Sequence, residues 1–320
     1  MARPLIPPAQ SQTGAADSAA GGAPLRSPLR CLLISARPEQ WSKNLFVFAG
    51  LLFGQRLTDL DAVWRASVAF VAFCALSSAV YLCNDVADRT ADRAHPLKRF
   101  RPVASGRLHV RTALAGAAVL GVGGLLATFS VSSQVGALAL LYIALLLVYS
   151  VLLKHVVIID VLTIAAGFVI RSAAGAVAVQ VPISEWLLVC TTLLALFLVL
   201  SKRRHELTLL ADRAIGHRRT LDDYSPHLLD QMIGVVTSST LVAYCFYAIS
   251  PDTAARLGTP RLPVTIPFVL YGIFRYLYLV HQKREGGSPA SLLLSDRPLL
   301  VCVALWGLSV YLVLYSPLGH

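Results

Sequence analysis

Charged side chains are scarce in this sequence. Of its 320 residues, 14% are charged and 56% are hydrophobic, and the mean hydropathy is +0.66. A soluble domain is about a quarter charged. The chain also lacks recurring segments of alternating hydrophobicity, the mark of a transmembrane barrel. Because open sheet edges cannot face lipid, the apolar segments are expected to be helices. The composition therefore excludes a soluble domain and predicts an all-α polytopic membrane protein.

Motifs of several common enzyme classes are also missing. No HExxH zinc motif, P-loop or GxSxG nucleophile elbow occurs. The six cysteines are scattered without a CxxC pair, so neither zinc nor a disulfide framework is expected. Residues 1–28 are rich in Pro, Ala, Gly and Ser, lack the apolar core of a signal peptide and predict a disordered cytoplasmic tail. Residues 29–320 are predicted to form a single transmembrane domain.

About nine segments are apolar and long enough to cross a bilayer as helices. The first is short, so eight spans are the alternative. The candidates run roughly over 41–55, 64–84, 112–130, 134–153, 157–179, 184–201, 228–250, 263–281 and 298–316.

The formal net charge of +11 is distributed unevenly. If the N-terminus is cytoplasmic, most of the 28 Lys and Arg residues lie in the tail and in the loops on the same side. The positive-inside rule then predicts a multi-pass membrane protein whose charged loops face the cytoplasm. We expect its membrane to be the inner (plasma) membrane of the cell. Anionic lipid headgroups and phosphorylated substrates suit this charge better than nucleic acid does.

An acidic cluster follows the second span. It consists of Asn84, Asp85, Asp88 and Asp92. On a continuous helix these side chains share one face, and converging oxygens suit Mg²⁺, which takes its remaining ligands from water and substrate phosphates. The next loop carries Lys98, Arg99, Arg101 and Arg107, which suit the uncovered phosphates. The pattern predicts a diphosphate site; the alternative is a solvated loop in which acids balance cations.

Other polar residues stand at the ends of spans. Lys43 precedes the first span, where it could bind a phosphate or act as a positive-inside anchor. Lys202 and Glu206 follow the sixth span and share a helix face. Lys202 could bind phosphate while Glu206 binds metal or a sugar hydroxyl, or the two could form a salt bridge in a snorkelling basic collar.

Ionisable groups also occur in the fourth and fifth spans. Arg171 lies inside the fifth span and needs an anion, which could be a buried carboxylate or a substrate phosphate. Asp160 stands about three helical turns earlier. Tyr149 and Lys154 close the fourth span, where Lys154 could be a phosphate ligand or one more cytoplasmic charge.

Together these motifs resemble the UbiA-type polyprenyl transferase superfamily of intramembrane enzymes. The acidic cluster carries its NDxxDxxxD pattern. Four ordered motifs are similar to the branch of decaprenyl-phosphate phosphoribosyltransferases. They are RPxQWxKNLFVFA at Arg37–Ala49, HPxKRxRPxASG at His95–Gly106, IRxxAG at Ile170–Gly175 and KRxxEL at Lys202–Leu207. Ordinary superfamily members have a second aspartate-rich motif in the last position, whereas this chain has one acid, Glu206, among cations, which disfavours a two-metal prenyl-diphosphate mechanism.

The resemblance implies a Mg²⁺-dependent glycosyltransferase. Members of the branch move 5-phosphoribose from phosphoribosyl pyrophosphate to a polyprenyl phosphate and release pyrophosphate, for cell-envelope polysaccharides such as arabinogalactan. The implied metal ligands are Asn84, Asp85, Asp88 and Asp92. The implied substrate-binding residues are Lys43, Asn84, Lys98, Arg101, Tyr149, Lys154, Arg171 and Lys202. The implied catalytic residues are Asp85, Asp88 and Glu206.

Two other functions remain open at this point. One is a UbiA-type prenyltransferase that joins a prenyl diphosphate to an aromatic acceptor. The other is a transporter, because broken helices and charges near the membrane midplane also occur in transporters.

Overall fold

The computed structural model describes residues 27–96, 98–211, 223–282, 292 and 295–315. Within these ranges the chain is helical and contains no strand, which confirms the all-α prediction. The tail predicted over residues 1–28 lies almost entirely outside the described residues.

The elements of the first half follow one another with short connections. They are α1 (Pro28–Ala36), the 3₁₀ helix η1 (Pro38–Phe48), α2 (Ala49–Phe53), α3 (Leu60–Ala87), α4 (Arg89–Ala94), η2 (Lys98–Phe100), α5 (Val110–Val131), α6 (Ser133–Val151) and η3 (Leu153–His155). The second half comprises α7 (Ile159–Ala178), α8 (Glu185–Ala211), α10 (Pro226–Ile249), α11 (Pro251–Leu257), η4 (Leu262–Thr265), α12 (Ile266–His281) and α14 (Arg297–Tyr315).

Eight of the described helices are long and apolar enough to cross a membrane, so the chain is a multi-pass membrane protein. The segment predicted as a first span over 41–55 is not one of them, because it forms η1 and the short helix α2 instead. Two spans are longer than predicted. Helix α3 continues to Ala87 and α8 continues to Ala211, so the acidic cluster begins on α3 and the Lys202–Glu206 segment lies on α8.

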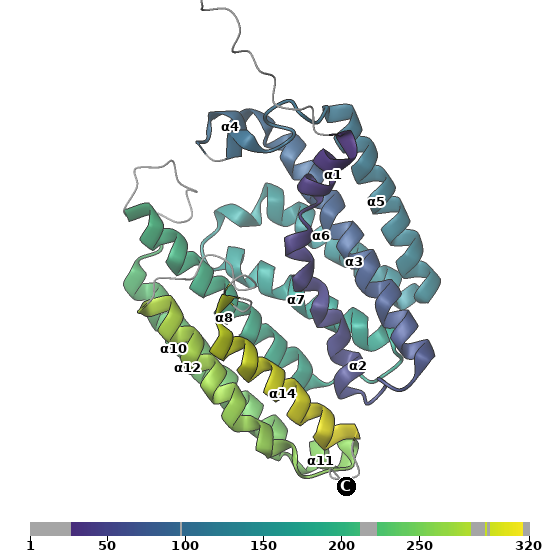
Figure 1. Cartoon of the computed structure of the whole chain (residues 1–320), viewed down its shortest axis with the longest axis vertical. Helices are drawn as coiled ribbons and strands as arrows, with labels where there is room; N and C mark the ends of the chain where they lie inside the picture. Colours follow the sequence, from purple (N-terminus) through teal and green to yellow (C-terminus); the bar gives the residue numbers. More distant parts are fainter. Residues whose placement is uncertain (1–26, 97, 212–222, 283–291, 293–294, 316–320) are drawn as a thin grey trace, which may run out of the picture.

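Figure 1 shows the two halves of the bundle side by side, with α1 to α6 on one side, α8 to α14 on the other, and α7 between them. Helix α7 packs against η1, α6 and α8. Helix α4 lies at one end of the bundle, and α11 lies at the opposite end (Figure 1). The acidic cluster is therefore far from the α11 end.

The backbones of η1 and α2 are both in direct contact with the backbone of α7. A Cβ atom on Gly175 would lie 1.8 Å from the carbonyl oxygen of Val47, and one on Gly50 would lie 2.6 Å from Cα of Ala176. Only residues without a side chain allow this approach. Val47 is fully buried in the same cluster as Ala174 and Ala178 of α7. This contact brings the preceding turn of η1, which carries Lys43, against the centre of the bundle.

An ion pair joins the last two spans. Arg275 of α12 donates to both carboxylate oxygens of Asp296, at 3.1 and 2.8 Å. Asp296 also accepts from the backbone N–H of Leu299, so it caps the first turn of α14.

We expect Gly175→Ala to destabilise the protein, because its Cβ would overlap the Val47 carbonyl. Overpacking of this kind costs about 1–3 kcal/mol. The measurement is the midpoint of thermal unfolding of purified protein in detergent. Gly234→Ala on α10 is the matched control, because no atom lies within 4 Å of the added Cβ. Equal midpoints for the two variants would contradict the close contact between η1 and α7.

Candidate functional site

The acidic cluster spans a break between two helices. Helix α3 ends at Ala87 and α4 begins at Arg89, but helical hydrogen bonding continues through Asp88. The Asp88 N–H donates to Asn84 O, and the Asp92 N–H donates to Asp88 O, both at 2.8 Å. Asp85 and Asp92 consequently remain two turns apart, and both are buried. Of the other two predicted ligands, Asn84 is half-buried and Asp88 is exposed.

Two arginines neutralise the buried carboxylates. Arg101 donates to Asp92 Oδ2 at 2.7 Å and lies 3.4 Å from Asp85 Oδ1. Arg37 donates to Asp85 Oδ1 at 2.5 Å and lies over the Tyr81 ring, 4.9 Å from its centroid. Arg101 was predicted as a site residue, but Arg37 was not. Its position in the RPxQWxKN motif was the available signal.

The donor atoms of this cluster suit a hard cation. Within the part of the chain that the structure describes, no group of three or more His, Cys, Asp or Glu side chains is placed to hold a metal. Mg²⁺ does not require such a cage, because it is usually bound by one or two carboxylates together with water and substrate phosphates. Asp85 and Asp92 converge on Arg101, and each contacts an arginine through one carboxylate oxygen. The pair therefore fits a Mg²⁺ ion that is brought in with a phosphorylated substrate.

Arg171 lies at the centre of the bundle on α7. It is 5% exposed, and its Nη2 donates to the Tyr142 hydroxyl at 2.5 Å. Its guanidinium also lies over the rings of Tyr142 and Phe168, at 4.8 and 4.9 Å from their centroids. Among the described residues Arg171 has no carboxylate partner, and its Nε has no hydrogen-bond acceptor. The sequence predicted either a buried carboxylate or a substrate phosphate as the partner of Arg171. In the described structure a hydroxyl and two aromatic rings stand where a buried carboxylate was expected.

Lys43 of η1 is surrounded by positive charge. It lies outside the eight spans. Burial, and after it the nearby cations Lys202, Arg171 and Arg37 in that order, together lower the pKa of its amine to about 7. No carboxylate forms an ion pair with Lys43 within the described ranges. A bound anion would therefore offset the free-energy cost of burying the charged amine and would reduce its repulsion by the neighbouring cations.

Helix α8 contributes the cation Lys202, which lies near Lys43 of η1. Lys202 Nζ lies 3.8 Å from Glu206 Oε1, which confirms that the two side chains share a helix face. Glu206 has a shorter contact that was not predicted, because Arg203 Nη1 donates to its Oε2 at 2.9 Å. Arg203 also lies 3.1 Å from Asp160, the acid at the start of α7.

Three further predicted substrate-binding residues lie on η2, α6 and η3. Lys98 is exposed on η2. Tyr149 lies near the end of α6 and is half-buried. Lys154 lies on η3 and is half-buried.

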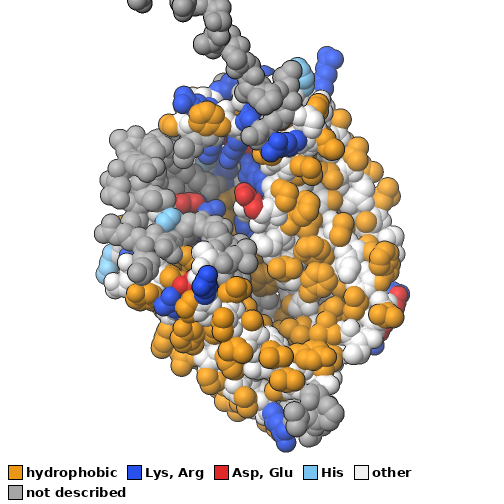
Figure 2. Space-filling model, in the orientation of Figure 1, with side chains coloured by type: hydrophobic (Ala, Val, Ile, Leu, Met, Phe, Trp, Pro, Cys, Tyr) orange, Lys and Arg blue, Asp and Glu red, His pale blue; other side chains and the backbone are white. Residues whose placement is uncertain are grey.

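We call the space between η1, α7 and α8 the cationic chamber, defined by Arg37, Lys43, Arg171 and Lys202. Figure 2 shows Lys and Arg side chains, with a few acids, gathered in a hollow on this face of the molecule. Charges in such a partly enclosed space interact more strongly than they do in water. The arrangement can bind a polyanion between the acidic cluster and α8.

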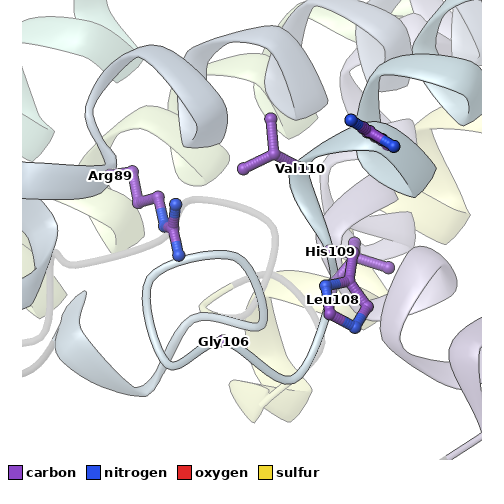
Figure 3. A pocket seen from close by; sticks show the side chains of 6 residues that line it. Arg89, Gly106, Leu108, His109 and Val110 are labelled. Atoms are coloured by element: carbon purple, nitrogen blue, oxygen red, sulfur yellow. The ribbon is translucent and has the colours of Figure 1, made fainter.

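A separate cavity of about 350 Å³ lies beside the loop between α4 and α5. Arg89, Gly106 and His109 lie around it in Figure 3, and Leu108, Val110 and Arg111 complete the lining. It contains none of the predicted site residues.

The sequence is similar to characterised families over most of its length. Residues 44–295 match the model of the UbiA prenyltransferase family. A decaprenyl-phosphate phosphoribosyltransferase of Mycolicibacterium smegmatis is 35% identical over 286 residues, which cover 86% of this chain and 89% of the relative. The protein of the same name from Mycobacterium tuberculosis is 33% identical, with 84% of this chain and 89% of the relative covered.

The fold is similar to that of solved proteins. A UbiA homolog from Archaeoglobus fulgidus bound to GPP and Mg²⁺ superposes with a TM-score of 0.68 at 16% sequence identity, covering 88% of this chain and 99% of that one. The match over most of the helical bundle agrees with the family resemblance of the motifs. The chain belongs to the UbiA prenyltransferase family.

Proposed function

We propose that this protein transfers 5-phosphoribose from phosphoribosyl pyrophosphate to a polyprenyl phosphate, such as decaprenyl phosphate, and releases pyrophosphate. The observation that carries the proposal is the cationic chamber, in which Lys43 and Arg171 have no carboxylate partner among the described residues. The names of the relatives from two mycobacterial species support the same reaction.

The number of phosphates supports this donor over a prenyl diphosphate. A prenyl donor with an aromatic acceptor brings one diphosphate. Phosphoribosyl pyrophosphate brings a diphosphate and a 5-phosphate, and the acceptor brings a further phosphate monoester of about −1.5 to −2 charge near neutral pH. Two of the chamber cations, Lys43 and Arg171, have no carboxylate partner among the described residues, which suits the more highly charged pair of substrates.

The chain's own residues take three roles around the donor: they bind its phosphates, hold the metal and contact the ribose. We assign Lys43, Arg171, Lys202, Lys98 and Arg101 to its phosphates, with Tyr149 and Lys154 at the rim. Asn84, Asp85, Asp88 and Asp92 would hold Mg²⁺, which supplies charge neutralisation for the leaving pyrophosphate. Glu206 would accept a hydrogen bond from a ribose hydroxyl near the reacting carbon.

Catalysis by this site requires positioning more than proton transfer. As the bond to pyrophosphate breaks, C1 of ribose becomes oxocarbenium-like, and the acceptor phosphate oxygen attacks it. That phosphate is already ionised near neutral pH, so it needs no strong general base. The chamber contributes by holding both substrates in line and by stabilising the charge that develops on the leaving group.

The proposal includes an orientation in the membrane. The excess of Lys and Arg in the tail and in the charged loops supports an inner-membrane protein whose chamber faces the cytoplasm. Residues 29–320 would then act as one catalytic domain, with the lipid tail between helices and its phosphate at the cytoplasmic rim. The product would serve the synthesis of cell-envelope polysaccharide precursors.

The direct test is transfer of label. Purified protein is incubated with radiolabelled phosphoribosyl pyrophosphate, Mg²⁺ and decaprenyl phosphate, and the lipid is extracted. We expect label in the lipid fraction only when the polyprenyl phosphate is present. A prenylated aromatic product from a prenyl diphosphate, without ribosylated lipid, would establish the rival enzyme reaction instead. The absence of pyrophosphate release with either donor would favour a transporter.

Asp85→Asn should lower turnover about 100-fold, because the neutral amide removes a buried negative charge from the predicted metal site. Asn can still accept a hydrogen bond from Arg37, so folding should change little. Asp61→Asn is the control, because Asp61 is an exposed acid at the start of α3 that pairs with Arg65. The measurement is the initial rate of phosphoribosyl transfer at saturating substrates. Wild-type turnover in Asp85→Asn would remove the metal role from this residue.

Donor affinity should fall as the pH rises from 7 to 9. The pKa of Lys43 is lowered to about 7 by burial and by Lys202, Arg171 and Arg37. Below that pH the amine is already charged, whereas above it the amine must take up a proton to bind a phosphate. The dissociation constant should therefore rise by up to about tenfold per pH unit.

Titration calorimetry of the donor across this pH range measures the effect. Lys43→Arg should bind the donor with little dependence on pH, because a guanidinium remains charged. A wild-type dissociation constant that stays the same at both ends of the range would show that Lys43 is not the titrating phosphate ligand.

A further inference from the structure

Arg203 of α8 contacts two carboxylates from different helices. Its Nη1 donates to Glu206 Oε2 at 2.9 Å, and its Nη2 lies 3.1 Å from Asp160 Oδ2. Arg203 is 6% exposed and Asp160 is fully buried. The two nitrogens of one planar group are thus used on two acids, which a point charge such as a lysine amine cannot reproduce.

Asp160 is itself held from the other side. The Tyr224 hydroxyl donates to Asp160 Oδ1 at 2.9 Å and accepts from the backbone N–H of Ile158 at 2.7 Å. Burial raises the pKa of Tyr224 to about 12, so its hydroxyl remains a donor. Because Ile158 and Asp160 belong to the start of α7, this pair of hydrogen bonds attaches Tyr224 to that helix.

These contacts form a chain that ends at Glu206. It runs from Tyr224 before α10, through Asp160 on α7, to Arg203 on α8. Its early members are buried, whereas the Glu206 side chain is 30% exposed. Arg203 occupies Oε2 of Glu206, and Lys202 lies 3.8 Å from Oε1. Arg203 therefore fixes Oε2 of Glu206, while Oε1 lies on the side of Lys202, one of the chamber cations.

We propose that Arg203 is a positioning residue for the phosphoribosyl transfer, which holds Glu206 in the orientation that contacts the ribose of the donor. The inference rests on the proposed function. Asp160 and Tyr224 act one step further back, because they fix the guanidinium of Arg203. Residues that lock the conformation of a reacting group in this way are often needed for activity without touching the substrate.

A purely structural role would need only one carboxylate. Replacing a buried ion pair by apolar groups is often neutral for stability, so the Arg203–Asp160 pair alone gives no reason to hold Glu206. The additional bond connects Arg203 to a half-buried acid one turn away on the same helix, so it joins no second helix and acts only on the position of Glu206.

A double-mutant cycle tests the proposal. Arg203→Lys should lower the turnover number for phosphoribosyl transfer about tenfold or more, while the donor KM changes less than about threefold. Glu206→Gln should have a similar effect. If Arg203 acts through Glu206, the double variant should be no slower than Glu206→Gln alone.

The matched control is Arg275→Lys. Arg275 also binds a carboxylate with two nitrogens, between α12 and α14, but it is not assigned to the site. Its substitution should leave turnover unchanged. Thermal unfolding of all variants separates loss of folded protein from loss of activity.

Tyr224→Phe provides a milder probe if Arg203→Lys does not fold. It removes the two hydrogen bonds of the hydroxyl, to Asp160 and from the Ile158 N–H, without changing any charge. It should lower turnover in the wild-type background but not in Glu206→Gln. If the losses of turnover are additive in either cycle, or if Glu206→Gln has wild-type turnover, the positioning role of Arg203 is wrong. The proposed function is not affected by either outcome. A wild-type protein that transfers no phosphoribose would overturn the proposed function, and with it the inference.

Discussion

The site depends on the cost of keeping positive charge inside a helical bundle. A charged side chain removed from water is expensive unless a partner compensates it. In the described structure, Arg171 is compensated only by the Tyr142 hydroxyl and two aromatic rings, and Lys43 has cations as neighbours. The packed helices maintain this arrangement because they hold η1, α7 and α8 together. The free energy that is not recovered within the protein becomes available for binding an anion, so the fold and the affinity for phosphates are linked.

Long apolar segments and the charges that end them predicted most of the architecture. The spans corresponding to α5, α6 and α10 begin and end within about two residues of their expected positions, within ordinary boundary uncertainty. The prediction of a regular span over 41–55 was wrong, because the conformation of this segment depends on a contact with a distant part of the chain. Val47 meets Gly175 backbone to backbone, and no local pattern of hydrophobicity reports such an approach.

The candidate site shows the same division between local and distant information. The pairing of Lys202 with Glu206 follows from helix geometry and was predicted. Asp160, which pairs with Arg203, and Asp85, which pairs with Arg37, are distant in sequence from those arginines, so these two pairs became visible only when α7, α8 and α3 were placed in space. The acidic residues were identified by their spacing, but the change of helix at Asp88, which leaves that residue exposed, was not.

The contact of Gly175 with Val47 has a meaning beyond packing. Two backbones that touch cannot approach further, and a single added methyl group would force them apart. Because Gly175 has no side chain, η1 and α7 pack at the smallest possible separation, and this separation sets the distance between Lys43 and Arg171. In a chamber whose properties depend on repulsion between cations, that separation determines the strength of the electric field that an incoming substrate meets.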